Sequence, residues 1–180
     1  MGDLKKAVFL DRDGTVMDEV GYCSRAEDVR AVPGARDALL ALRDAGYLLI
    51  VVTNQSGIGH GYFTEAEYLA VNAELERQLT PVQFDAVYFS SETPDAATER
   101  RKPGIGMVTE AVERFGIDLA RSFFVGDRTG DVECGRRAGT RTILVATGYG
   151  ADHRESRPDY VARDIVEAAD IILNGEPPGP

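Results

Sequence analysis

Apolar runs alternate with helical stripes along this chain. Each apolar run is short enough for a buried strand, and between the runs apolar residues recur at helical spacing. The predicted strands are Lys5–Leu10, Tyr47–Val52, Phe84–Phe89, Ser122–Val125 and Arg141–Val145, with a last short one at Ile171–Leu173. The predicted helices are Ala35–Ala45, Thr64 to about Leu79, Ile105–Phe115, Gly130–Ala138 and Arg163–Ala169. Such alternation predicts an α/β fold with a doubly wound parallel sheet, in one domain over residues 1–180.

Polar clusters follow three of these strands directly. Asp11-Arg12-Asp13, Thr53-Asn54 and Gly126-Asp127 each stand where an apolar run ends, and Arg101-Lys102-Pro103 precedes a helix. Ligands of open α/β sheets bind outside the carboxyl ends of the strands. We therefore expect the four clusters to meet at one edge of the sheet. The alternative for Asp-x-Asp-Gly is an ordinary strand end and turn, where Asp and Gly are common.

Composition narrows the choice of partners and location. The 180 residues carry a net charge of −10, so nucleic acid and anionic membranes are not expected as general partners. No apolar run is long enough to cross a bilayer and no signal peptide is evident, which favours a cytoplasmic protein, expected to be a monomer. Cys23 and Cys134 are expected to be free thiols. The tail from about residue 175 to 180 is expected to be frayed.

The residue types in the clusters suit one chemistry. Mg²⁺ prefers carboxylate oxygens together with waters and phosphate oxygens. An Asp carboxylate can attack phosphorus and form an aspartyl-phosphate, while a second Asp moves protons. A lysine and the metal ion neutralise charge on the transferring group. The residues of these clusters therefore favour Mg²⁺-dependent phosphoryl transfer; they are Asp11, Asp13, Asp127, Lys102, Arg101 and Thr53.

Four motifs in order resemble those of the haloacid dehalogenase (HAD) phosphohydrolases. Asp11-Arg12-Asp13-Gly14-Thr15 is similar to the first motif, Thr53 to the second, Lys102 to the third and Gly126–Asp131 to the acidic fourth. The sequence around these motifs, with Val-Val-Thr-Asn-Gln-Ser-Gly-Ile and Arg-Lys-Pro, resembles that of the branch that contains heptose bisphosphate phosphatases and histidinol phosphatases. The resemblance implies a HAD-like Rossmannoid fold.

The resemblance also implies roles. Asp11 would be the nucleophile and Asp13 the general acid/base, and Thr53 and Lys102 would hold the phosphoryl group. Mg²⁺ would be bound by the Asp11 side chain, the Asp13 backbone carbonyl and Asp127. The implied substrate-binding residues are Glu19, Tyr22, Thr53, Asn54, Gln55, Ser56, Arg101, Lys102 and Arg128.

Two residues of these motifs, Asp131 and Arg12, each have two possible roles. Asp131 is either a further acidic ligand or partner of the metal site, or a cap of the following helix. Arg12 either points into the site or is solvated.

One segment departs from the branch. Its members commonly carry a zinc loop of three Cys and one His before Arg-Lys-Pro, whereas Ser90–Arg100 contains neither residue, so no Zn²⁺ is expected. The 39 residues between Asp13 and Thr53 and the 48 between Thr53 and Lys102 leave no room for a cap domain. An open site fits a small phosphorylated sugar held mostly by its phosphate, or a larger substrate that supplies its own cover. The resemblance implies a heptose bisphosphate as the leading substrate. The alternatives are histidinol phosphate or another small metabolite and, in a different class, a non-catalytic binding module of the same fold.

Overall fold

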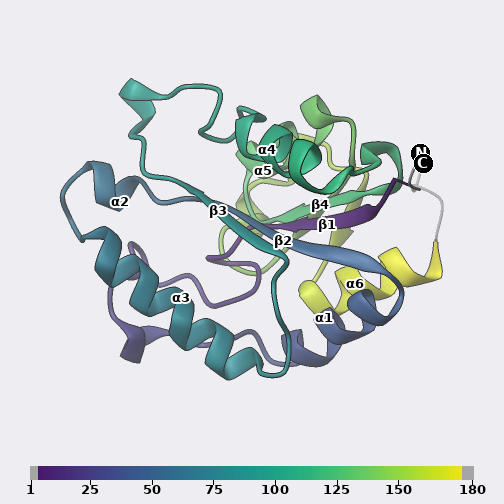
Figure 1. Ribbon diagram of the computed structural model, residues 1–180, viewed down its shortest axis with the longest axis horizontal. Coiled ribbons are helices and arrows are strands. Elements are labelled where there is room, and N and C mark those ends of the chain that lie inside the picture. The colour runs from purple at the N-terminus through teal and green to yellow at the C-terminus, as the bar shows by residue number, and fades with distance from the viewer. Residues whose placement is uncertain (1–3, 176–180) are drawn as a thin grey trace.

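Six parallel strands form one sheet in the computed structural model, which describes residues 4–175 (Figure 1). The strands are β1 (Lys6–Leu10), β2 (Tyr47–Asn54), β3 (Ala86–Ser90), β4 (Phe123–Gly126), β5 (Arg141–Val145) and β6 (Tyr160–Ala162). Their order across the sheet is β3-β2-β1-β4-β5-β6. The direction in which strands are added therefore reverses between β1 and β4, which is where open α/β sheets bind ligands. This sheet confirms the predicted fold class.

Helices cover both faces of the sheet. They are α1 (Ala35–Asp44), α2 (Ser56–Gly59), α3 (Glu65–Leu79), α4 (Gly106–Phe115), α5 (Thr129–Ala138) and α6 (Ile165–Asn174). In Figure 1, α4 and α5 lie above the sheet, and α1, α3 and α6 lie below it. No separate domain is inserted among the described residues.

The apolar side chains of the central strand divide between two cores. Val8 and Leu10 of β1 belong to the core shared with α1, α3 and α6, whereas Ala7 and Phe9 belong to the core under α4 and α5. Side chains of a strand alternate between faces, so a continuous apolar run is what a strand covered on both sides requires. This packing fixes β1 rigidly, and Asp11 follows it directly.

The predicted end of the chain was partly wrong. Ile171–Leu173 is not a strand: it belongs to α6, which begins after Asp164, whose side chain accepts hydrogen bonds from the backbone of Val166 and Glu167, both at 3.0 Å. The sixth strand is instead Tyr160–Ala162. A three-residue apolar run fits either structure, and here the helix gains a cap and an apolar face. The predicted frayed tail lies outside the described residues apart from Gly175.

Other local expectations hold. Thr64 and Glu67 form a capping box at the start of α3, and Cys23 and Cys134 are free and buried. The short helix α2, after β2, was not predicted. In the part of the chain that the structure describes, no helix has the length and apolar character needed to cross a membrane.

Candidate active site

The polar clusters meet at the carboxyl edge of the sheet. Asp11 follows β1 and Asp127 follows β4, and these two strands are hydrogen-bonded neighbours. Almost all the predicted site residues line one cavity of about 400 Å³ at this edge; they are Asp11, Asp13, Glu19, Tyr22, Thr53, Asn54, Gln55, Ser56, Arg101, Lys102, Arg128 and Asp131. Asp127 is completely buried and does not line the cavity, but its carboxylate lies within 4.8 Å of those of Asp11 and Asp131. The expectation that the clusters share one edge is confirmed.

Lys102 occupies the centre of the site. Its ammonium nitrogen donates to Asp11 Oδ1 at 2.8 Å, to Asp131 Oδ1 at 2.6 Å and to the backbone oxygen of Val52 at 2.7 Å. Burial by itself would lower the pKa of Lys102, but the two carboxylates outweigh it, so the pKa is raised. Lys102 is therefore a fixed cation whose three protons are all directed at acceptors.

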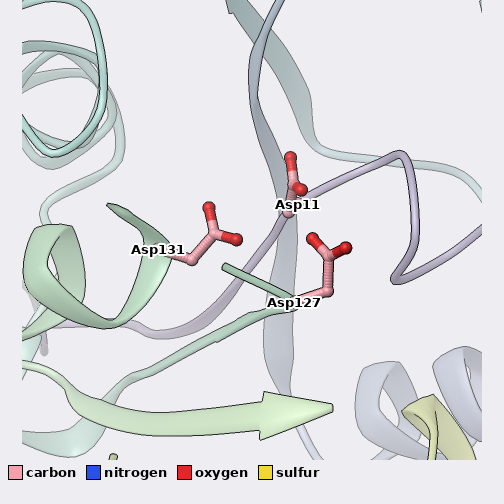
Figure 2. A group of neighbouring side chains, drawn as sticks. All are labelled: Asp11, Asp127 and Asp131. Carbon is pink, nitrogen blue, oxygen red and sulfur yellow. The ribbon is translucent and has the colours of Figure 1, made fainter. Parts of the chain in front are cut away.

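Three carboxylates lie near this lysine, and Figure 2 shows them close to one another. Oxygen atoms of Asp11, Asp127 and Asp131 all lie within 4.8 Å of one another. Burial, together with Asp11 and Asp131, raises the pKa of Asp127 to about 8. Burial and Asp11 raise the pKa of Asp131 to about 6, although Lys102 opposes that shift. Like charges so close are costly unless a cation joins them.

This cluster fits a divalent cation. Asp127 Oδ1 is buried without a hydrogen-bond partner, while Oδ2 accepts from the backbone N–H of Tyr149 at 2.9 Å. Three carboxylates and the ammonium of Lys102 leave two negative charges, which one Mg²⁺ balances. Oxygen-only ligands of this kind suit Mg²⁺ rather than a thiolate-seeking metal.

Two glycines shape the space around Asp127. Gly14 (φ +79°) and Gly148 (φ +58°) have left-handed backbones, and a Cβ on either residue would overlap the Asp127 carboxylate. The loop after β1 and the loop after β5 can approach this side chain only because both positions lack a side chain. Thr147 ties the two loops together, donating from Oγ1 to the backbone oxygen of Gly14 at 2.7 Å.

Asp131 caps the following helix and also belongs to the carboxylate cluster. Its Oδ2 accepts from the backbone N–H of Arg128 at 3.0 Å, which caps the start of α5, and its Oδ1 accepts from Lys102. The side chain is 3% exposed. A Cβ at Gly126 would overlap it, so the glycine before Asp127 is required by packing against Asp131.

Asp13 belongs to a different network. Arg12 donates from Nε to Asp13 Oδ2 at 3.0 Å and from Nη2 to Oδ1 at 3.1 Å. Gln55 donates from Nε2 to Asp13 Oδ2 and to Thr53 Oγ1, both at 2.9 Å. Arg12 is therefore neither solvated nor a lining residue of the cavity: it lies behind Asp13, 1% exposed.

The outer wall of the cavity is basic and aromatic. Arg128 pairs with Glu19 (Nη2 to Oε2, 3.3 Å), and its guanidinium carbon lies 4.1 Å from the centre of the Tyr149 ring. Arg101 donates from Nη1 to the backbone oxygen of Glu92 at 2.7 Å. Arg101 and Arg128 thus present positive charge near the anionic centre, where a substrate with two anionic groups can use it.

Two residues differ from what their sequence context indicates. Asn54 lines the cavity, but its amide exchanges two hydrogen bonds of 3.0 Å with the backbone of Lys102, so it positions the lysine. Tyr149 was missed. The signal was its place four residues beyond the end of the predicted strand Arg141–Val145, whose carboxyl end lies at the same edge.

Comparison with known proteins gives consistent matches over nearly the whole chain. The family model described as haloacid dehalogenase-like hydrolase matches residues 8–114, and a second HAD-hydrolase-like model matches residues 99–168. A D-glycero-D-manno-heptose-1,7-bisphosphate 7-phosphatase of Chlorobaculum tepidum is 37% identical, with 96% of each chain covered. A D-glycero-beta-D-manno-heptose-1,7-bisphosphate 7-phosphatase of Yersinia pestis is 38% identical, over 92% of this chain and 94% of the relative.

A solved structure agrees with these matches. The crystal structure of a D,D-heptose 1,7-bisphosphate phosphatase from B. bronchiseptica, complexed with magnesium and phosphate, superposes with a TM-score of 0.88 at 30% identity. The match covers 95% of this chain and 99% of that one. The shared fold therefore includes the sheet edge that bears the carboxylates.

Proposed function

The chain belongs to the haloacid dehalogenase-like hydrolases, and from that membership we propose that it is a Mg²⁺-dependent phosphatase acting on D-glycero-D-manno-heptose 1,7-bisphosphate at the 7-phosphate. The family inferred from the four motifs is confirmed. The observation that carries the activity is the convergence of Asp11, Asp127 and Asp131 around one fixed lysine at the switch point of the sheet. The names and high coverage of the relatives support the substrate.

Asp11 is the nucleophile in this proposal. Its carboxylate attacks the phosphorus of the ester and forms an aspartyl-phosphate, which water then hydrolyses. Lys102 orients Asp11 before the attack, because it holds Oδ1 at 2.8 Å. The Thr53 hydroxyl, 1% exposed at the end of β2, and Lys102 hold the transferring phosphoryl group. Asp11, the Asp13 backbone carbonyl and Asp127, with Asp131 adjacent, would hold Mg²⁺, which would neutralise charge at the phosphoryl oxygens when bound.

Asp13 moves the protons. Its side chain is 16% exposed and lines the cavity, so it reaches the leaving oxygen of a bound ester, which it protonates as the alcohol departs. The same carboxylate then accepts a proton from the water that cleaves the aspartyl-phosphate. Asp11 and Asp13 therefore have separate partners, Lys102 and Arg12, which keeps the attacking carboxylate apart from the proton-carrying one.

The outer wall would recognise the rest of the sugar phosphate. Arg101, Arg128 and Glu19 line the cavity, together with Tyr22 and the segment 54–56. A bisphosphate carries a second anionic group, for which the two guanidiniums provide counter-charge. Histidinol phosphate, the alternative substrate, carries a cationic amine and no second phosphate, so the positive charges of Arg101 and Arg128 disfavour it.

The proposal also covers location, assembly and metal content. Two buried free thiols, Cys23 and Cys134, suit the reducing cytoplasm, and the net charge of −10 opposes binding to nucleic acid or an anionic membrane. We propose that the protein acts as a monomer there on a small phosphorylated metabolite. No Zn²⁺ is part of the proposal, since residues 90–100 contain neither Cys nor His.

A phosphatase screen tests the substrate. The purified protein is assayed for phosphate release with Mg²⁺ against both anomers of heptose 1,7-bisphosphate, histidinol phosphate and a panel of monophosphates, with Asp11→Asn as the blank. The expected result is a kcat/KM for one heptose bisphosphate anomer about 100-fold above every monophosphate, consistent with one well-recognised extra phosphate. A higher kcat/KM on histidinol phosphate, or release from none of the esters, would contradict the proposal.

A further inference from the structure

Arg12 is a buried cation directly beside the proton-carrying carboxylate. It is among the largest fully buried side chains of the described residues, although arginine is rarely buried unless it is paired. Its partner is Asp13, to which Nε and Nη2 donate at 3.0 and 3.1 Å, one to each carboxylate oxygen. A fork of this kind fixes the plane of a carboxylate as well as its distance.

The other side of Arg12 is held by a remote helix. Its Nη1 donates to Oδ1 of Asn72 in α3 at 2.7 Å, and its guanidinium carbon lies 5.1 Å from the centre of the Tyr68 ring on the same helix. The guanidinium is therefore clamped between α3 and Asp13. Asn72 and Tyr68 do not line the cavity, so this clamp acts on the reaction only through Asp13.

Gln55 closes the network from the cavity side. Its amide nitrogen has two protons, and they go to Asp13 Oδ2 and Thr53 Oγ1, both at 2.9 Å. The proton carrier and the hydroxyl that holds the phosphoryl group are thereby set at a fixed separation through one side chain. A general acid is effective only within hydrogen-bond reach of the atom that it protonates.

We propose that Arg12, anchored by Asn72, is a positioning residue that aims the Asp13 carboxyl group at the leaving oxygen of the ester. This inference rests on the proposed phosphatase function but not on the identity of the sugar. Arg12 touches neither the phosphoryl group nor the metal-binding carboxylates in this network. It therefore serves protonation of the leaving group and activation of water, and not the attack by Asp11 or the binding of phosphate.

The leaving group distinguishes this role from a structural one. An alkoxide needs a proton in order to depart, whereas 4-nitrophenolate departs without one. A misaligned Asp13 therefore slows the first turnover of a sugar phosphate but not the first release of nitrophenolate, although it slows the later hydrolysis of the aspartyl-phosphate with both esters. Arg12→Lys keeps the charge but cannot form the fork or reach Asn72 in the same geometry.

The experiment compares the first turnover of two esters by rapid mixing with Mg²⁺. For Arg12→Lys, we expect the first-turnover rate on the heptose bisphosphate, or on whichever sugar phosphate the wild type hydrolyses fastest, to fall about 100-fold, as for a lost general acid. The first release of nitrophenolate from 4-nitrophenyl phosphate should stay within about threefold of the wild type, followed by a slower steady rate. Asn72→Ala should give the same pattern at about tenfold, since it removes one anchor of the fork.

The matched control is Arg43→Lys, the same exchange in a partly buried ion pair with Asp85 at the opposite edge of the sheet. It should leave both first-turnover rates unchanged. Equal losses on the two esters in the folded Asn72→Ala protein, or no loss on the sugar phosphate, would overturn the positioning role. If the wild type hydrolyses other sugar phosphates but not heptose bisphosphate, only the proposed substrate fails, and the Arg12 comparison still gives its answer on the better ester.

Discussion

The ammonium nitrogen of Lys102 lies 2.8 Å from Oδ1 of Asp11, and the two residues are 91 positions apart in the sequence. Lys102 stands just before α4 and Asp11 just after β1, so the contact joins two loops across the carboxyl edge of the sheet. Its geometry is completed by Asn54, which pairs with the backbone of Lys102 through two hydrogen bonds. The nucleophile proposed here is therefore oriented before any substrate arrives.

Asp11→Asn should remove activity without unfolding the protein. A carboxamide does not form the acyl phosphate, so kcat should fall about 10³-fold or more, as for loss of other nucleophiles. The folded state should survive, because Lys102 keeps Asp131 and Val52 as acceptors while one of the crowded carboxylates is replaced by a neutral amide. Phosphate release checks the loss of activity, and thermal unfolding in EDTA checks that the fold is retained. Mg²⁺-dependent turnover at the wild-type rate would contradict the mechanism.

Lys102→Met should impair both stability and catalysis. It leaves Asp11 and Asp131 buried without their shared cation, and breaking a buried ion pair costs about 3 to 5 kcal/mol. Urea denaturation in EDTA should show that loss, and kcat should fall about 10²- to 10³-fold, as when one charge-stabilising donor is removed. Lys6→Met, which alters a lysine over the Tyr47 ring, serves as the control and should leave kcat unchanged. Unchanged stability in Lys102→Met would show that the cluster does not need this cation.

Stability without metal should fall as the pH rises. Asp127 has a folded pKa of about 8, above the value of about 3.9 for an unfolded Asp. Between these values the folded protein keeps a proton that the unfolded chain has lost, so the free energy of unfolding decreases as the pH rises through this window. Mg²⁺ competes with that proton, so the rise in melting temperature on adding Mg²⁺ should be larger at pH 8 than at pH 6. Equal rises at the two pH values, measured against EDTA, would contradict cation binding at this cluster.

Gly148→Ala should weaken Mg²⁺ binding. The new Cβ overlaps the Asp127 carboxylate, so this residue must move, and changes in the groups that orient a metal ligand typically cost about 10- to 100-fold in affinity. Gly139→Ala is the matched control: it has φ +91° and open space around its Cβ, so it carries the backbone cost alone. Mg²⁺ titrations of activity should shift for Gly148→Ala and not for Gly139→Ala. The same shift in both variants would assign the effect to backbone strain.

Zinc should be neither present nor needed. The loop between β3 and α4 is tied by its own side chains: Glu92 accepts from the backbone N–H of Thr98 at 2.8 Å and from its hydroxyl at 2.7 Å. Elemental analysis of the purified protein should give well under one Zn²⁺ per chain, and a zinc-selective chelator should leave kcat unchanged when Mg²⁺ is supplied. Stoichiometric zinc would contradict the expectation drawn from residues 90–100.

The sequence was most informative where strong apolar runs end in unusual polar residues. Asp11, Thr53 and Asp127 could be assigned to one edge because each follows a predicted strand, and parallel strands bring their carboxyl ends together. The pairing of Lys102 with Asp131 could not be predicted, since it depends on how α5 is placed relative to the loop before α4. Pattern alone gives the edge of the sheet but not the hydrogen bonds across it.

Arg12 and the final elements show where local patterns were insufficient. The position after Asp11 reads equally well as solvated or as pointing into the site, and its actual environment comes from α3, some 60 residues later. Tyr160–Ala162 is only three residues long and was not recognised as a strand. Ile171–Leu173 was predicted as a strand because its apolar run is continuous. The sequence also contains Asp164, a residue type that commonly caps helices, and the helix that follows it includes Ile171–Leu173.

The loop tied by Glu92 and Thr98 also affects how this protein could be redesigned. Glu92 and Thr98 bond within the loop, and its later end is fixed by Asn54, which bonds the backbone of Lys102, and by Arg100, which pairs with Glu110 of α4. Residues 93–97 of the loop can thus be exchanged without removing a hydrogen bond from Asp11, Asp13 or Asp127. None of residues 93–97 lines the cavity, so a library confined to this segment should change the surface beside the site and leave its chemistry unaltered.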